Sequence, residues 1–349
     1  MKKKNGLIRM TRKGAVYFAL FWTFVYLAVF GPKNLKNLTE RPAAQPVQGE
    51  LTIHFIDVGQ ADAAVILCGG QVMMIDGGNA EDSSLIYSYL RNTLGVSHID
   101  YMIATHPHED HIGGLSGALN ACSVGMVFSP VTQYESKVFE SLDKYTQKQG
   151  KRLTVPAVGE TLKLGEAEVQ FLSPGRQYAD INDMSIVVRL TFGQTSFLFT
   201  GDAEWEAEHD LIESGYELSS TLLKVGHHGS SSSSSYVFLR EVMPQYAVIS
   251  VGTGNSYGHP AESALSRLRD AGASIYRTDQ NGHIVVVSDG RELKVSVQKG
   301  EASIQQVVTQ NRPLSFYEVV QEIEKDAAQY LKKLWNDMIS SLGRSIIGR

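Results

Sequence analysis

The stretch IATHPHEDHIGGL, residues 103–115, places three of the ten histidines of the chain within six positions, directly after an apolar run. Imidazole nitrogens and carboxylate oxygens are ligands that a borderline cation such as zinc takes at about 2.0–2.2 Å. A loop with these ligands can hold a metal when the apolar run before the loop forms a strand, because the strand fixes the position of the loop. The stretch therefore predicts a metal site that includes His106, His108, Asp110 and His111.

Short apolar runs recur from Leu51 onward, most of them bounded by Gly, Asp, Asn or Pro. Runs of this kind predict β-strands, and the near-continuous ones predict sheets covered on both faces. The twelve predicted strands lie within 51–58, 63–68, 71–76, 99–105, 125–129, 167–173, 185–192, 195–200, 221–226, 246–252, 283–288 and 293–298. Stretches with helical periodicity lie at 83–94, 134–149, 206–215 and 261–272. The pattern predicts an α/β protein of two sheets with helices outside.

Further metal-binding residue types follow other apolar runs. Asp76, Asp202, His227 and His228, and finally His259 each come within a few residues of such a run. Ligands that are distant in sequence can meet when strand ends share one edge of the fold. We therefore expect these side chains to converge on the 106–111 loop.

Together these residues resemble a known family. HxHxDH followed by GG, then a strand ending in GD, then HHG, is the metal signature of the metallo-β-lactamase fold. The segments HFIDVGQADA, MMIDGG, NDMSIVVRLTFGQTSFLFTGD, LLKVGHHGSSSSSS and ISVGTGNSYGHP are similar to the hydrolase domain of ComEC-type competence proteins and their stand-alone relatives, which include secreted phosphodiesterases. The resemblance covers roughly residues 51–298 and implies an αββα sandwich.

The resemblance also implies two divalent metal ions, with zinc expected and manganese or iron as alternatives. The implied ligands are His106 and His108 for one ion, Asp110, His111 and His228 for the other, and Asp202 as a bridge. The implied catalytic residues are Asp110, His227 and His259. The implied supporting or substrate-contacting residues are Asp76, Asn182, Ser230, Asn255 and Tyr257.

This sequence departs from the family pattern at two places. Asn182 stands near the position where many relatives have another histidine, so the first ion is expected to have fewer protein ligands. Ala61 stands where the family usually has glycine. Two other features stay open from sequence: Lys224 is either a phosphate contact or a structural residue, and residues 232–235 are expected to form a solvated loop.

The expected function is a metal-dependent phosphodiesterase in which two ions lower the pKa of a shared water toward neutrality. DNA, a nucleotide or a cell-envelope phosphoester is the expected substrate. The alternatives are a hydrolase of lactones, thioesters or β-lactams, and a non-catalytic metal-binding module for competence or envelope work. Residues 51–300 contain 17 Lys and Arg against 29 Asp and Glu, a formal balance of −12. That balance disfavours tight sequence-independent nucleic-acid binding, which normally uses a basic surface.

The N-terminus predicts a membrane anchor. Six basic residues precede the uncharged run at 15–30, which spans about 24 Å as a helix. The basic flank predicts a single-pass protein of the cell membrane with its catalytic domain outside, and a cleaved signal peptide with secretion is the alternative. The predicted division is 1–31 for the flank and anchor, 32–50 for a linker, 51–300 for the hydrolase domain and 301–349 for a helical tail. The tail carries an amphipathic pattern from Ser315 that fits docking, dimerisation or membrane-surface binding.

Overall fold

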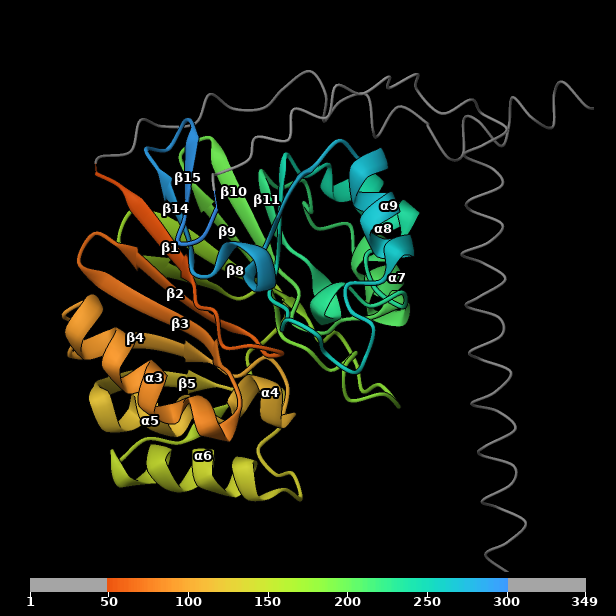
Figure 1. Cartoon of the computed structure of the whole chain (residues 1–349). Coiled ribbons are helices and arrows are strands. Elements are labelled where there is room, and N and C mark those ends of the chain that lie inside the picture. Colours follow the sequence, from red (N-terminus) through yellow and green to blue (C-terminus); the bar gives the residue numbers. More distant parts are fainter. Residues whose placement is uncertain (1–48, 301–349) are drawn as a thin grey trace, which may run out of the picture. The chain divides into compact units, whose positions relative to one another are not determined.

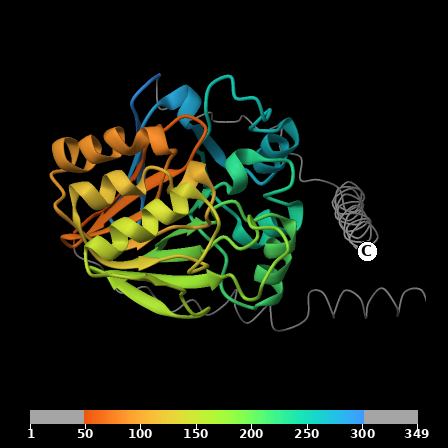
Figure 2. The ribbon, with the colours of Figure 1, turned by 90° about the horizontal axis from the view of Figure 1, so that it is seen from below.

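The structure, a computed structural model, describes residues 49–300. Two β-sheets pack face to face, and helices cover the outer face of each, as Figures 1 and 2 show. The predicted αββα sandwich is thus confirmed. The predicted anchor at 15–30 and the tail helix lie outside the described residues. Among the described residues, no helix combines the length and apolar character needed to cross a membrane.

The first sheet has eight strands in the order β15-β14-β1-β2-β3-β4-β5-β6. The strands are β1 (Leu51–Phe55), β2 (Ala63–Cys68), β3 (Gln71–Gly77), β4 (His98–Ile103), β5 (Ser123–Phe128), β6 (Leu153–Thr154), β14 (Ile284–Ser288) and β15 (Leu293–Val297). Strands β3 to β6 run parallel to one another. Strand β1 pairs with β2 on one side and with β14 on the other, so the end of the domain closes against its beginning.

The second sheet has seven strands in the order β13-β12-β11-β10-β9-β8-β7. The strands are β7 (Thr161–Leu164), β8 (Ala167–Ser173), β9 (Val187–Phe192), β10 (Thr195–Phe199), β11 (Leu222–Lys224), β12 (Tyr246–Ile249) and β13 (Ser274–Arg277). Strands β10 to β13 are parallel to one another. Each sheet therefore contains a parallel half whose carboxyl ends lie along one edge.

Helices follow the parallel strands on the outer faces. They include α3 (Ser83–Ser88), α4 (Glu109–Ile112), α5 (Leu115–Ala121), α6 (Lys137–Lys148), α7 (Trp205–Glu213), α8 (Tyr236–Val242), α9 (Glu262–Asp270) and α10 (Thr278–Asn281). In Figure 1, α3 to α6 lie along the first sheet and α7 to α9 along the second. Sequence signals explain some of these ends: Ser136 and Ser235 cap α6 and α8 by accepting hydrogen bonds from the N–H groups of Phe139 and Phe238.

The apolar residues form three buried clusters that correspond to the interfaces between the four layers. The central cluster contains Phe55, Phe171, Phe197 and Phe199, all at most 1% exposed, between the two sheets. A second cluster fills the space between the first sheet and its helices, and a third does the same for the second sheet. Burial on both faces explains the near-continuous apolar runs seen in the sequence. It also fixes the strand ends that carry the polar clusters.

Candidate metal centre

The polar clusters predicted from sequence meet at the carboxyl ends of the parallel strands. The 104–111 loop follows β4 of the first sheet, whereas Asp202 follows β10 and the pair of histidines at 227 and 228 follows β11 of the second sheet. Asp202 lies 3.8 Å from His106 and 3.2 Å from His111, and His228 lies 3.2 Å from Asp110. The predicted convergence is therefore confirmed.

Asp202 lies at the centre of the cluster and is 2% exposed. Its Oδ1 lies 3.2 Å from His111 Nε2, and its Oδ2 lies 3.8 Å from Nε2 of both His106 and His228. His227 Nε2 lies 3.7 Å from the same Oδ2. One carboxylate thus faces histidines from both sheets, which is the position expected of a bridging ligand.

The side chains present fit a divalent cation. Asp110, His111, Asp202 and His228 each offer one ligand atom, and these atoms all lie within 4.8 Å of one another. His111 Nε2 and Asp202 Oδ1 are buried without a hydrogen-bond partner although they face each other. Their 3.2 Å separation matches two ligands of a tetrahedral ion held at about 2.0–2.1 Å. The two remaining predicted ligands, His106 and His108, touch each other at 3.0 Å beside this group.

Hydrogen bonds set which ring nitrogen of each histidine faces the cluster. His111 Nδ1 donates to Asp76 Oδ2 at 2.8 Å, and His228 Nδ1 donates to the carbonyl oxygen of Ser250 at 2.9 Å. Nε2 of both rings is therefore left to face Asp202. Asp76 itself accepts hydrogen bonds from the backbone N–H and the hydroxyl of Thr105. Asp76 therefore contacts the ring of a predicted ligand, and partners of this kind orient metal-binding imidazoles.

The charged side chains of the cluster shift one another's pKa values. Burial alone would lower the pKa of His111, but the carboxylates of Asp202 and Asp76 raise it well above its ordinary value. Burial likewise opposes ionisation of Asp110, yet the charge of His111 and a hydrogen bond from His228 lower the pKa of Asp110 to about 2. The charges of His111 and His228 likewise outweigh burial and hold the pKa of Asp202 well below its ordinary value, so Asp110 and Asp202 are ionised at neutral pH and can coordinate a cation, which would take the place of the protons on the rings.

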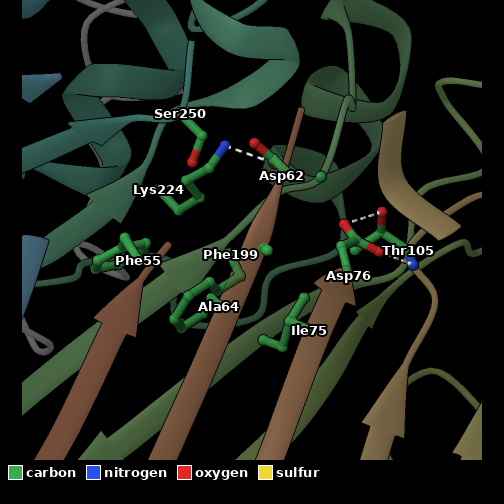
Figure 3. A pocket seen from close by; sticks show the side chains of 11 residues that line it. Phe55, Asp62, Ala64, Ile75, Asp76, Thr105, Phe199, Lys224 and Ser250 are labelled. Atoms are coloured by element: carbon green, nitrogen blue, oxygen red, sulfur yellow. Dashed lines mark hydrogen bonds and ion pairs between the residues drawn. The ribbon is translucent and has the colours of Figure 1, made fainter. Parts of the chain in front are cut away.

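A buried ion pair lies behind His228 and was not expected from sequence. Lys224 Nζ lies 2.7 Å from Asp62 Oδ2, and the other Asp62 oxygen lies 3.4 Å from His228 Nδ1. Figure 3 shows this pair at the top of a small internal cavity that also contains Asp76, Thr105 and Ser250. Lys224 is 4% exposed and does not line the open cavity of the site, so its structural interpretation holds and its interpretation as a phosphate contact is wrong.

His227 is held by a second residue that sequence reasoning missed. Its Nδ1 donates to Glu204 Oε1 at 3.1 Å, and Ser232 Oγ donates to the same oxygen at 2.9 Å. Glu204 is 6% exposed and follows Asp202 by two positions. In the sequence, only the position of Glu204 two residues after the aspartate of the GD motif could have pointed to this role. His227 and His228 both adopt left-handed backbone conformations, with φ of 47° and 51°, which are rare for residues other than glycine.

The serine run after these histidines is ordered and buried, so the expected solvated loop is wrong. Ser233, Ser234 and Ser235 are at most 6% exposed. Glu208 accepts hydrogen bonds from the backbone N–H groups of Ser234 and Ser235, and Arg267 donates to three carbonyl oxygens of the run. The composition resembles a linker, but buried charged partners fix its backbone.

An open cavity of about 360 Å³ lies over the cluster. Its lining residues are Gln60, His108, Glu109, Asp110, Asn182, Asp202, His227, His228, Tyr257 and His259. Of the predicted supporting or substrate-contacting residues, Asn182 and Tyr257 thus line the cavity, whereas Ser230 and Asn255 do not. Asn182 presents a buried side-chain oxygen without a hydrogen-bond partner.

His259 differs from His227 in its charge. Burial, followed by the charges of His227 and His228, lowers the pKa of His259 to about 4, whereas Asp202 and Glu204 overcome burial and raise the pKa of His227. His259 is therefore a neutral ring at pH 7. Of the two, His227 is better equipped to donate a proton to a substrate oxygen.

Comparisons with known proteins agree with this geometry. The sequence model of the Metallo-beta-lactamase superfamily matches residues 56–253. The chain is 30% identical over 265 residues to competence protein ComA of Neisseria gonorrhoeae, covering 75% of this chain and 34% of that protein. It is 28% identical over 257 residues to ComE operon protein 3 of Bacillus subtilis strain 168, covering 68% of this chain and 33% of that protein. The chain thus matches about a third of the length of these relatives.

Among solved structures, the chain is similar to the metallo-beta-lactamase fold protein YhfI from Bacillus subtilis, with a TM-score of 0.46, 13% identity and coverage of 69% of this chain and 100% of that one. The family match and the two curated relatives confirm the resemblance inferred from the sequence motifs. The chain belongs to the metallo-beta-lactamase superfamily, and its sequence relatives there are competence proteins of the ComEC type.

Proposed function

We propose that this protein is a metal-dependent phosphodiesterase that acts outside the cytoplasm. The observation that carries the proposal is the position of Asp202, whose two carboxylate oxygens face imidazoles on both sides at 3.2–3.8 Å. That arrangement supports the binding of two cations, with zinc as the first choice and manganese or iron as alternatives. DNA, a nucleotide or a cell-envelope phosphoester is the proposed substrate.

Bound divalent ions would supply an acidified water and neutralise charge on phosphoryl oxygens. The protein supplies the geometry around them. His106, His108 and Asp202 would hold one ion, with Asp110, His111, Asp202 and His228 around the other. Asp110 Oδ2, at 3.2 Å from His228 Nε2, lines the cavity and can also orient a water by accepting its hydrogen.

His227 is the proposed donor to the substrate. Because Glu204 accepts from its Nδ1, its Nε2 faces Asp202 and the cavity. From there it can donate a hydrogen bond to a phosphoryl oxygen or to the leaving oxygen. Asn182 lines the same cavity and can accept a hydrogen from substrate or water with its unpartnered side-chain oxygen.

The names of the sequence relatives favour a phosphodiester over a carbonyl substrate. One relative is named competence protein ComA, a second ComE operon protein 3, and a third, from Haemophilus influenzae, recombination protein 2, and the first and third names point to nucleic acid. Hydrolysis of a nucleic-acid phosphodiester is consistent with these names.

The proposed location rests on residues 1–31. Their basic flank and uncharged run support a single-pass anchor with the domain outside the cell membrane, and secretion after cleavage is the alternative. Protease treatment of intact cells tests this: the domain should be degraded from outside if it is anchored, and it should be found in the medium if it is secreted. Protection of the whole chain in intact cells would contradict the proposal.

Activity is tested with the purified full chain, loaded with zinc or manganese and analysed for bound metal. The wild type should hydrolyse bis-p-nitrophenyl phosphate faster than a lactone, a thioester or a β-lactam. His108→Ala and Asp202→Asn should lose this activity, whereas His209→Ala, at a ring 66% exposed on α7, should keep it. Preferred cleavage of a lactone would support the alternative hydrolase. Bound metal without turnover of any substrate would support a binding module.

A further inference from the structure

An exposed aromatic residue lies at the opening of the proposed active site. Tyr257 is 71% exposed, more than any other large apolar side chain in residues 49–300. It lines the same cavity as His108, Asp110 and Asp202, whereas Tyr87, Met126, Val155 and Met243, the other exposed large apolar residues, do not. Leaving an aromatic ring in water forgoes the free energy of burying it. A ligand that covers the ring would recover that free energy.

The loop that carries Tyr257 is fixed by one side chain. Asn255 Oδ1 accepts from the backbone N–H groups of Tyr257 and His259, and Asn255 Nδ2 donates to the carbonyl oxygens of Gly252 and His259. Gly252 N–H in turn donates to the side chain of Gln60, which lines the cavity. The ring is therefore exposed on a preorganised loop, which lowers the entropy cost of binding a planar ligand.

Four neighbouring rings form a spatial series from the metal cluster to Tyr257. The ring centroids of His228 and His227 are 6.2 Å apart, those of His227 and His259 5.5 Å, and those of His259 and Tyr257 5.8 Å. The last two rings are nearly parallel, with an interplanar angle of 17°. His259 and Tyr257 thus present flat faces next to the place where a phosphodiester would meet the ions.

The charged side chains that line the cavity indicate which part of a nucleic-acid substrate the protein could hold. The lining residues include Glu109, Asp110 and Asp202 but no lysine or arginine. Apart from the histidines of the cluster, a substrate with several phosphates would find no cationic side chain here to hold its backbone, in contrast to the usual basic nucleic-acid groove. Stacking of a nucleobase on an aromatic face needs no charge and tolerates any base. Bases are free for such stacking in single strands and short oligonucleotides.

We propose that Tyr257, backed by His259, is a base-stacking subsite that holds a nucleobase beside the scissile phosphodiester of a single-stranded substrate. The proposal rests on the phosphodiesterase function proposed above. It assigns the exposed tyrosine to substrate binding and leaves the chemistry to the metal cluster. A teichoic-acid polyol phosphate has no planar group to stack here, and a phosphocholine ester would cover the ring only with its quaternary ammonium, through a cation–π contact that the base-bearing and abasic oligomers do not make.

The test compares an octathymidylate with the same backbone carrying abasic tetrahydrofuran units, using the metal-loaded full chain. The wild type should favour the base-bearing substrate in kcat/KM. Tyr257→Ala should reduce the ratio of the two kcat/KM values by about tenfold, mainly through KM. Tyr257→Phe and Tyr257→Trp should retain the ratio because both rings stack. Tyr87→Ala, at a tyrosine 45% exposed on α3, is the matched control and should also retain it.

Equilibrium binding separates this inference from the function on which it rests. Fluorescence anisotropy of labelled octathymidylate and abasic oligomer measures base preference without turnover, and the dinucleotide thymidylyl-thymidine as competitor distinguishes a nucleotide from a polymer site. Base preference that disappears in Tyr257→Ala supports the subsite even if no phosphodiester is hydrolysed. Equal treatment of both oligomers by the wild type, or an unchanged ratio in Tyr257→Ala, would overturn it while leaving the phosphodiesterase proposal intact.

Discussion

Lys224 Nζ lies 2.7 Å from Asp62 Oδ2, and both residues are at most 4% exposed. Burial alone would raise the pKa of Asp62, but the charges of Lys224 and His228 hold it well below its ordinary value. Asp62 is therefore an ionised group whose neighbours are one lysine and one proposed metal ligand. Its backbone also joins two loops of the first sheet, because Asp62 N–H, just before β2, donates to the carbonyl oxygen of Asp110, which follows β4.

Replacing Lys224 by Met should leave the Asp62 carboxylate buried without its cation. Breaking a buried pair in this way costs about 3–5 kcal/mol, so the free energy of unfolding should fall by that amount. Urea unfolding measures the change. Lys163→Met is the matched control: its ion pair with Glu168 is exposed, and its loss should cost at most about 1 kcal/mol. Equal costs for the two variants would show that the Asp62 pair contributes nothing specific.

Asp76→Asn should weaken metal binding through His111. The variant can no longer hold a carboxylate against His111 Nδ1, which now donates to it at 2.8 Å. Loss of such a partner typically lowers metal affinity by about 10- to 100-fold. Competition with a chromophoric chelator measures the affinity. Asp100→Asn removes a carboxylate that accepts the Val72 N–H in the same sheet, and this control should bind metal like the wild type.

Glu204→Gln should lower kcat by about 10- to 100-fold on a phosphodiester substrate, because His227 would lose the carboxylate that orients its Nδ1. The content of bound metal should not change, since Glu204 accepts hydrogen bonds from His227 and Ser232, neither of which is a proposed metal ligand. Glu206→Gln, which removes a carboxylate paired with Arg176 near the surface, is the control. A variant that turns over substrate at the wild-type rate would remove Glu204 from the proposed site.

Stability should fall as the pH rises from about 4.5 to 7 because of Glu208. Burial outweighs the hydrogen bonds from Ser235 and raises the pKa of Glu208 from 4.5 to about 7. Between these values the folded protein keeps a proton that the unfolded chain releases, so deprotonation opposes folding there. The contribution amounts to about 3 kcal/mol across the window. Urea unfolding from pH 4.5 to 8 should show this slope in the wild type and a flatter one in Glu208→Gln.

The strands were predictable from sequence where both of their faces are buried. All twelve predicted runs overlap a strand, and β2 and β8 begin and end as predicted. The sequence did not predict β6, β7 and β13, which all lie at sheet edges. Strand β6 also has only two residues, Leu153–Thr154. The segments TLKL and SIYR mix charged with apolar residues, because an edge strand is partly solvated. Helix α8 was missed since the serine run before it concealed its cap, Ser235.

The candidate site was predictable to the extent that its residues carry recognisable chemistry. Histidines and aspartates after apolar runs identified the cluster, because metal ligands are of few types and strand ends share an edge. Asp62 and Glu204 could not be found this way. The role of Asp62 depends on its contact with Lys224, 162 positions away in the sequence. The role of Glu204 depends on its contact with the ring of His227, whose backbone has a left-handed conformation. The ligand roles of the clustered residues stay predictions.

The cluster draws its residues from both sheets: Asp110 and His111 follow β4, whereas Asp202 and His228 follow β10 and β11. Neither sheet alone brings four ligand atoms together. A nascent chain that has made only its first 150 residues holds the HxHxDH loop without its counterpart. Tight capture of a cation therefore has to wait until the second sheet has docked, which makes metal uptake a marker of completed assembly.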